Sequence, residues 1–184
     1  MVQTCRTFLK LILMINEKVK IGKPEVIELK PEWFRMGYYV YVVLIQYKRK
    51  KYYYIGMTGD RKHHTARSPF YRMGGHFSLG KSTQNQIIKG IIKSLKLNVK
   101  ENPNLLCGIR FTYYTWLVKP FDNKVLPEKH KENRELAERI ESGLMRKFKV
   151  LFGDEFVFNK HESRKVITGV EKQVEQICKY FVDK

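Results

Sequence analysis

Two short aromatic and apolar runs on either side of a basic cluster constrain the fold of this chain most strongly. The runs are residues 38–45 and 52–55, and Gly56 follows the second one. Aromatic and β-branched residues favour strands, and two such runs joined by a short polar stretch are typical of an antiparallel hairpin. The basic cluster between them consists of Lys48, Arg49, Lys50 and Lys51. The sequence therefore predicts a β-hairpin with a basic tip.

Further segments with regular patterns extend this hairpin into a chain of mixed strands and helices. Residues 82–97 and 132–150 carry apolar side chains at helical spacing, and residues 105–118 are rich in strand-forming types, so we expect two helices around a third strand. Residues 120–131 are expected to form a charged connection. The last helix has an apolar face made of Val170, Val174, Ile177, Cys178 and Phe181. We expect one domain over residues 37–160, an N-terminal arm over residues 1–36 and a C-terminal helix over residues 161–184.

The charge balance restricts the class of partner. The 184 residues include 36 Lys and Arg against 18 Asp and Glu, a formal net charge of +18. Such a surplus indicates a polyanion, and we favour nucleic acid over a membrane because no long basic amphipathic helix or lipidation signal is present. Cys5, Cys107 and Cys178 lie far apart without CxxC spacing. They predict neither a disulfide framework nor a zinc site and are typical of a reducing cytoplasm.

An apolar run at residues 8–15 resembles the core of a signal peptide. Lys10 interrupts this run, which is too short to span a bilayer and has no small-residue cleavage site after it. We therefore expect a soluble, cytoplasmic protein. Because Met14 lies inside the run, a second hypothesis is that translation begins there and that residues 1–13 are not part of the native protein. An N-terminal peptide that begins before Met14 in mass spectrometry would contradict this hypothesis.

Several polar residues have types that can hold a cation or take part in catalysis. Arg72 and His76 are four apart and share one face if their segment is helical. Glu141 lies at the edge of the apolar face of the second helix, whereas Glu135 and Glu138 are expected to face water. A carboxylate in the position of Glu141 could hold one divalent cation through oxygen.

Each of these residues also has a plainer interpretation. Strand tyrosines usually pack in the core, and Glu141 alone would be a boundary charge on an amphipathic helix. The adjacent His63 and His64 lack metal-ligand spacing, so we assign them no role. The combination and order of the polar residues therefore carry the functional prediction.

In that order, the residues resemble the motifs of the GIY-YIG nuclease family. The matches span residues 38–159. The first motif corresponds to Tyr39, Val40 and Tyr41, and the second to Tyr54, Ile55 and Gly56, followed by Met57, Thr58, Gly59 and Asp60. The Arg-x-x-x-His pair corresponds to Arg72 and His76, the helix Glu to Glu141 and the late Asn to Asn159. Two alternatives remain open. Tyr39 would be the family tyrosine if the first motif began at Gly37, and Arg67 is a rival to Arg72 because the loop after Met57 is long.

The resemblance implies an α+β fold, in which helices flank a small three-stranded antiparallel sheet, and hydrolysis of DNA with one Mg²⁺ or Mn²⁺ per active site. It implies that Glu141 holds the metal and that Arg72 clamps the phosphate. Tyr41 or Tyr54 would act as general base, with its pKa lowered by neighbouring positive charge. His76 would orient groups or relay protons, and Asn159 would position the metal ligand or the phosphate.

The surplus of basic residues predicts contacts with the backbone of double-stranded DNA. The candidates are Lys48, Arg49, Lys50, Lys51, Arg61, Lys62, Arg67 and Lys81. A restriction-type endonuclease, dimeric on DNA because one site cuts one strand, is the first expectation. A homing or mobile-element endonuclease is the second, and a structure-specific repair nuclease is the third. A non-catalytic DNA-binding module is the alternative from another class, although binding alone does not require Glu141.

Overall fold

The fold is built on a three-stranded antiparallel sheet. The computed structural model describes residues 28–61, 63–77, 86–97, 103–159 and 168–183. Strands β1 (Gly37–Tyr47), β2 (Lys50–Met57) and β3 (Arg110–Pro120) are arranged in the order β2-β1-β3. The prediction of a mixed α+β chain with a hairpin and a third strand is confirmed. Met14, the apolar run at residues 8–15, Cys5, Lys62 and Lys81 lie outside the described residues.

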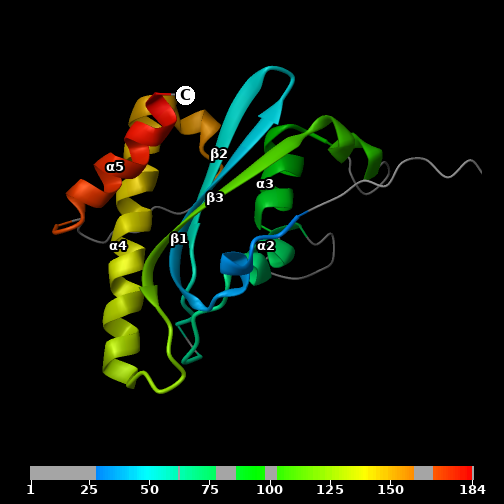
Figure 1. Ribbon diagram of the computed structural model, residues 1–184. Coiled ribbons are helices and arrows are strands. Elements are labelled where there is room, and N and C mark those ends of the chain that lie inside the picture. Colours follow the sequence, from blue (N-terminus) through cyan, green and yellow to red (C-terminus); the bar gives the residue numbers. More distant parts are fainter. Residues whose placement is uncertain (1–27, 62, 78–85, 98–102, 160–167, 184) are drawn as a thin grey trace, which may run out of the picture.

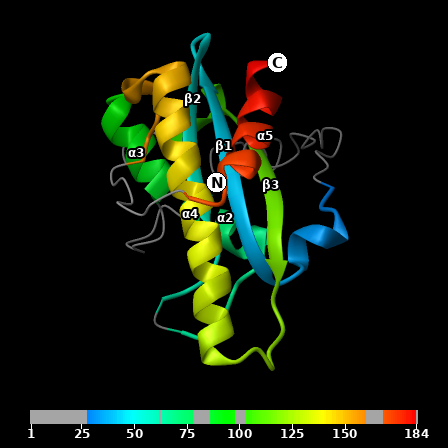
Figure 2. The same ribbon diagram turned by 90° about the vertical axis from the view of Figure 1, so that its left-hand side faces the viewer.

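The helices cover both faces of this sheet. Helices α4 (Pro127–Phe152) and α5 (Glu171–Val182) lie against one face, and α2 (Pro69–Phe77) and α3 (Gln86–Ser94) lie on the other (Figure 1 and Figure 2). Short 3-10 turns, η1 (Pro31–Phe34), η2 (Pro103–Gly108) and η3 (Asp154–Phe156), connect the larger elements. Among the described residues, no helix combines the length and the apolar character that crossing a membrane requires.

Strand alternation divides the hairpin residues between two cores. Tyr38, Val40 and Val42 of β1 pack with α4 and α5, whereas Tyr41 and Val43 point to the opposite face and pack with α3. Successive side chains of a strand point to opposite faces, so neighbours in the sequence enter different environments. The apolar face predicted for the C-terminal helix is confirmed, because Val174, Ile177, Cys178 and Phe181 of α5 and the preceding Val170 are all buried.

The element boundaries differ from the predicted ones at three places. The hairpin turn consists of Lys48 and Arg49 alone, both with positive φ, whereas Lys50 and Lys51 belong to β2. Positive φ at both central residues suits the twist of a two-residue hairpin, so the strands continue closer to the tip than the apolar pattern indicated. The third strand begins at Arg110, after the turn η2. Helix α4 begins at Pro127, inside the expected connection, because proline is favourable in the first turn of a helix.

Candidate functional site

A cluster of aromatic hydroxyls and one histidine occupies the face of the sheet next to α2. Tyr41 is paired with Gly56 on β2 and with Thr115 on β3. In this register Tyr54 and Tyr113 are its diagonal neighbours on the same face. The Tyr113 ring stacks on the Tyr41 ring with 5.0 Å between centroids, and the Tyr54 ring lies 6.3 Å from it. Three phenols therefore meet at the centre of the sheet.

Helix α2 adds a histidine to these phenols. The Tyr41 hydroxyl and His76 Nε2 are 2.6 Å apart, and both side chains are fully buried, with Tyr41 at 0% exposure. The His76 ring also lies edge-on to Tyr54, at 5.1 Å between centroids. A phenol and an imidazole at this distance share a hydrogen bond through which a proton can pass.

Gly56 makes room for this arrangement. A Cβ atom at Gly56 would lie 2.2 Å from the Tyr41 hydroxyl and 2.3 Å from its Cζ. The Tyr41 ring therefore lies directly over the backbone of β2, an approach that only glycine permits. The glycine of the Tyr-Ile-Gly motif is thus explained by packing against the tyrosine of the neighbouring strand.

Tyr39, the alternative first-motif tyrosine, lies elsewhere. The pairing of β1 with β3 shifts register between Tyr38 and Tyr39, and the Tyr39 ring approaches Gly37. Burial raises the pKa of Tyr39, and the charges of Arg35 and Glu32 act on it. Of the two candidates, Tyr41 is the one that the structure brings together with His76 and Tyr54.

Arg72 brings positive charge to the cluster. Burial alone would lower its pKa, but the negative charge that can form on Tyr41 and Tyr54 outweighs burial, so the pKa of the guanidinium is raised. Its Nε atom is buried and makes no hydrogen bond in the described part of the chain. The rival Arg67 lies over the Tyr71 ring, with its Cζ 4.3 Å from the centroid. Arg72, rather than Arg67, therefore faces the phenols.

The tyrosine hydroxyls do not have the lowered pKa values that the general-base expectation requires. Burial raises the pKa of Tyr41, although the charge of Arg72 opposes the shift, and it raises the pKa of Tyr54 well above its usual value. The negative charge of Glu141 adds to both shifts. The phenols are therefore neutral at neutral pH and can donate hydrogen bonds, while His76 is the group that can accept a proton from Tyr41.

Glu141 enters the site from α4. It is half-buried, and its loss of water together with the neighbouring charge of Glu138 raises its pKa to about 8, against the opposing charges of Arg72 and Arg61. The neighbouring positive charges therefore do not fully stabilise the ionised form of Glu141. A divalent cation would supply that charge, and Mg²⁺ commonly takes only one or two protein carboxylates beside water and phosphate oxygens. Among the described residues no three His, Cys, Asp or Glu side chains gather as a metal site.

Asn159 bonds to the backbone of β2, and its role beside a metal ligand or a phosphate stays a prediction. Its Oδ1 accepts a hydrogen bond from the Ile55 amide at 2.8 Å, and its Nδ2 donates to the Ile55 carbonyl at 2.6 Å. The preceding Phe158 amide donates to the Tyr53 carbonyl at 2.8 Å. Asn159 therefore extends the edge of the sheet and holds β2 next to Tyr54.

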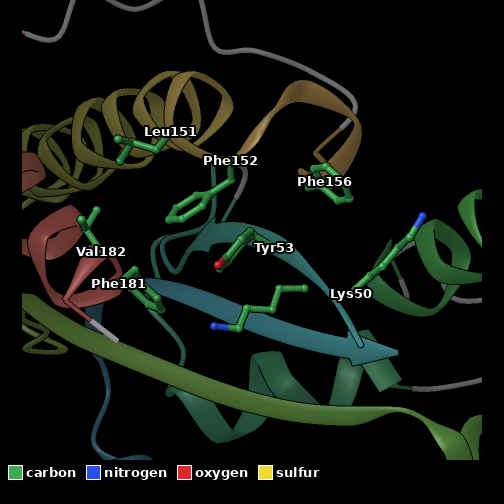
Figure 3. Close-up of a pocket in the computed structure, with 8 residues that line it drawn as sticks. Lys50, Tyr53, Leu151, Phe152, Phe156, Phe181 and Val182 are labelled. Atoms are coloured by element: carbon green, nitrogen blue, oxygen red, sulfur yellow. The ribbon is translucent and has the colours of Figure 1, made fainter. Parts of the chain in front are cut away.

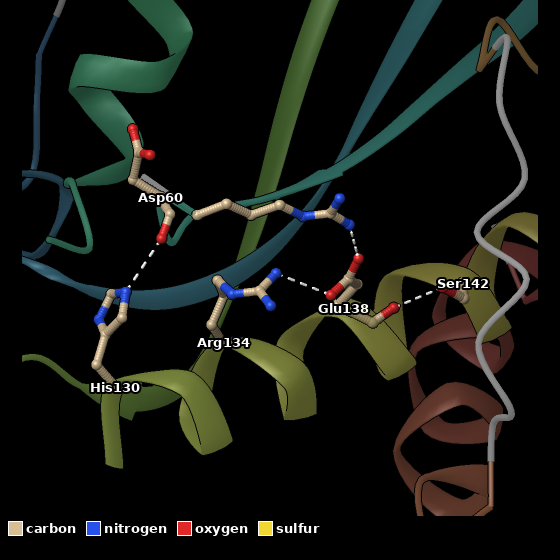
Figure 4. A network of polar contacts seen from close by, with 6 residues as sticks. Asp60, His130, Arg134, Glu138 and Ser142 are labelled. Carbon is tan, nitrogen blue, oxygen red and sulfur yellow. Dashed lines mark hydrogen bonds and ion pairs between the residues drawn. The ribbon is translucent and has the colours of Figure 1, made fainter. Parts of the chain in front are cut away.

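An ion-pair network around the buried Glu138, absent from the sequence-based prediction, joins α4 to the loop after β2. Both Arg61 and Arg134 donate to the Glu138 carboxylate, and the Arg134 bond measures 2.9 Å (Figure 4). The expectation that Glu138 faces water is wrong, since it is only 4% exposed. The spacing of Arg134 and Glu138, four apart on a helix, was the sequence signal for this pair. The pairing brings Glu138 and Arg61 close enough to act on Glu141.

His130 anchors the same loop one helical turn away from Arg134. Its Nδ1 lies 2.7 Å from the Tyr38 hydroxyl, and its Nε2 lies 3.0 Å from the Asp60 carbonyl oxygen (Figure 4). The His64 ring packs edge-on against it, with 4.6 Å between centroids. These contacts hold the residues that follow the Tyr-Ile-Gly motif against α4, so this loop has a defined position beside Arg72.

The basic hairpin tip is distant from this cluster. Lys48 follows Tyr41 by seven residues along β1, which corresponds to roughly 23 Å. The exposed Lys50 and Lys51 line a pocket of about 530 Å³ on the α4 and α5 side of the sheet, together with Tyr53, Phe152 and Phe181 (Figure 3). The tip therefore offers positive charge at a separate place from Arg61, Arg67 and Arg72.

Comparisons with known proteins add no family to this description. A scan against protein-family models found no match, and neither did searches of curated proteins and of solved structures.

Proposed function

We propose that the chain is a metal-dependent DNA endonuclease of the GIY-YIG type, with a restriction-type enzyme as its first biological role. The single observation that supports this best is the convergence of Tyr41, His76 and Arg72 on Glu141, a half-buried carboxylate whose pKa is raised to about 8. Structural carboxylates are normally placed where their charge is compensated, and strongly perturbed groups concentrate at functional sites.

The residues of this cluster match the demands of phosphodiester hydrolysis. Attack on phosphorus requires a deprotonated water and stabilisation of the charge that builds on the phosphate oxygens. Arg72 binds a phosphate oxygen through its free Nε–H and holds a permanent positive charge beside it. Tyr41 orients the attacking water through its hydroxyl, and the proton passes from the water through Tyr41 to Nε2 of His76.

The remaining residues hold this machinery in place. Glu141 would hold the divalent ion, Mg²⁺ or Mn²⁺, which supplies Lewis-acid chemistry at the phosphate when bound. Tyr54 donates a hydrogen bond from its neutral hydroxyl to the substrate, because its raised pKa keeps it protonated. Asn159 is a positioning residue that acts through the backbone of Ile55.

The charge of the chain supports DNA as the substrate. The formal net charge is +18, and the described basic residues include exposed ones at the hairpin tip and in the loop after β2. Contacts with phosphates provide affinity without reading bases. Double-strand cleavage by one site per chain requires two copies on the DNA, so a homodimer on its target is part of this proposal.

The test is incubation of the purified protein with supercoiled plasmid in Mg²⁺ or EDTA, with products resolved on a gel and their ends sequenced. We expect nicked and linear DNA in Mg²⁺ alone. Glu141→Gln and Arg72→Ala should reduce cleavage by at least about a hundredfold, as loss of a transition-state contact does, while DNA is still shifted in a gel. Defined ends would support a restriction or homing enzyme, and the length of the site separates these two.

A matched control is Glu132→Gln on the same helix, because Glu132 is exposed and pairs with the exposed Lys129. It should cleave as the wild type does. Near wild-type cleavage by Glu141→Gln would contradict the assignment of the site. DNA binding that is equal in Mg²⁺ and EDTA, without cleavage of plasmid, branched or damaged DNA, would support a non-catalytic binding module instead.

A further inference from the structure

Three arginines meet at a cavity beside the tyrosine cluster. The cavity has a volume of about 220 Å³ and is lined by Met57, Gly59, Asp60, Arg61, Arg67 and Arg72. Arg61 follows β2, Arg67 precedes α2 and Arg72 lies within α2. The fold thus brings guanidinium groups from three places in the sequence around one space.

The charges around this cavity favour an anion. Asp60 is the single carboxylate among the lining residues, and its Oδ1 already accepts the His63 amide at 3.2 Å. Glu138, outside the lining, compensates the charge of Arg61, so Arg67 and Arg72 against Asp60 leave a net positive charge at the cavity. Like charges this close repel unless an anion lies between them. Arginine forks match the paired oxygens of a phosphate group, whereas a cation would be repelled.

The three guanidiniums are held by contacts outside the cavity. Arg61 is paired with Glu138 of α4, and Arg67 lies over the Tyr71 ring at 4.3 Å. Arg72 is buried against the tyrosine cluster and keeps its Nε–H without a partner in the described part of the chain. Donors that are positioned before the ligand arrives lose little conformational entropy on binding.

We propose that this cavity binds a second backbone phosphate of the substrate, the neighbour of the phosphate at the cleavage position. The inference rests on the proposed nuclease function, because Arg72 lies at the boundary between the cavity and the Tyr41 cluster and therefore contacts both phosphates. Arg67 and Arg61 hold the second one. The strand then lies in a fixed direction across the site, and cleavage requires a charged linkage on one defined side of the cut.

The experiment compares two small ligands by isothermal titration calorimetry in EDTA, where cleavage does not interfere. Thymidine 3′,5′-bisphosphate carries two phosphates at backbone spacing, and thymidine 5′-monophosphate carries one. We expect the bisphosphate to bind about tenfold or more tightly, which is the gain from one additional charge-assisted phosphate contact. Arg67→Gln should bring the ratio of the two affinities close to one, and Arg67→Lys, which keeps the charge but not the fork, should give an intermediate ratio.

The matched control is Arg110→Gln, since Arg110 is an exposed arginine at the start of β3, away from the cavity. It should leave the ratio unchanged, and thermal unfolding of each variant shows that the fold is intact. Equal affinities for the two ligands in the wild type, or an unchanged ratio in Arg67→Gln, would overturn the proposal. If the protein cleaves plasmid but binds both ligands equally, the second phosphate site is contradicted and the nuclease function is not. If it prefers the bisphosphate but cleaves no DNA, the nuclease function is contradicted and the cavity remains an anion-binding site.

Discussion

The two faces of the sheet are built from the same strands but differ in chemical character. The face under α4 and α5, called the dry face below for its aromatic core, packs Tyr53, Phe148 and Phe181 ring against ring, and its polar contacts, at His130 and Glu138, lie toward the loop after β2. The face under α2 and α3 also buries apolar side chains, yet at its centre Tyr41, Tyr54 and His76 bury polar atoms together. Packing of apolar rings on the dry face stabilises the fold, whereas burial of polar atoms on the polar face lowers its stability.

This difference arises between adjacent residues. Tyr53 and Tyr54 are neighbours in β2, but Tyr53 stacks on Phe152 at 4.5 Å in the dry core while Tyr54 joins the cluster beside His76. Glu141 belongs to α4, a helix of the dry face, but its charge acts on Tyr41 and Tyr54. A residue at the edge of one layer can therefore complete a site in the other.

The largest effect should come from removing a ring from the dry face. Phe148→Ala should lower the free energy of unfolding by about 3–5 kcal/mol, because the fully buried ring leaves a cavity between α4, α5 and β2. Urea denaturation measures this change. Val150→Ala on the same helix, where the side chain is 83% exposed, should change stability by less than about 0.5 kcal/mol. Equal effects of the two variants would show that the Phe148 ring does not contribute the packing assigned to the dry face.

Burial of Glu141 beside the polar face should make the free energy of unfolding depend on pH. Glu141 has a pKa of about 8 in the folded chain, above its value of 4.5 in the unfolded chain, so folding is penalised once the unfolded chain ionises. The penalty is absent below about pH 4.5, grows as the pH rises and levels off above about pH 8.

Glu141→Gln removes this penalty. The variant should match the wild type near about pH 4 and exceed it by up to about 5 kcal/mol near about pH 9, measured by urea denaturation in EDTA. Mg²⁺ should narrow the difference at high pH, because it stabilises the ionised carboxylate. A difference that is constant from acid to alkaline pH would show that Glu141 titrates normally.

Close approach of Tyr41 to the backbone should make Gly56 sensitive to one methyl group. Gly56→Ala should lower the free energy of unfolding by about 2 kcal/mol, because its Cβ would overlap the Tyr41 ring and displace it from His76. Gly74→Ala is the control, since nothing lies within 4 Å of its Cβ position in α2, and it should stabilise the chain by about 0.5–1 kcal/mol. Chemical denaturation measures the free energy of unfolding of both variants. An unchanged value for Gly56→Ala would show that β2 shifts to accommodate the methyl group without loss of stability.

The smallest effect is expected at the third phenol. The Tyr113 hydroxyl is buried and makes no hydrogen bond in the described part of the chain. Tyr113→Phe should therefore leave stability unchanged or raise it by up to about 1 kcal/mol, whereas Tyr41→Phe loses the bond to His76 and should lower it by about 1 kcal/mol. Thermal unfolding of the pair measures the difference. If Tyr113→Phe is less stable than the wild type, the Tyr113 hydroxyl has a hydrogen-bond partner.

Local patterns were enough to predict several elements. The hairpin and the amphipathic helix α5 follow from spacing and residue type, because each depends on contacts within one segment. Arg72 and His76 share one face because their segment forms α2, a condition that the sequence left open. The exact ends of β3 and α4 did not follow, since turn geometry and a proline in the first helical turn decided them.

The amino-acid sequence by itself determined the hairpin, the third strand, the apolar faces of α3, α4 and α5 and the surplus of positive charge. Only the tertiary structure decided that Tyr113 stacks on Tyr41, that Glu138 is buried in an ion pair with Arg61, and that the pKa of Glu141 is raised. The physical reason is that strand register and helix placement set these distances. Burial and neighbouring charge, which control the pKa, belong to the environment that the packed elements create.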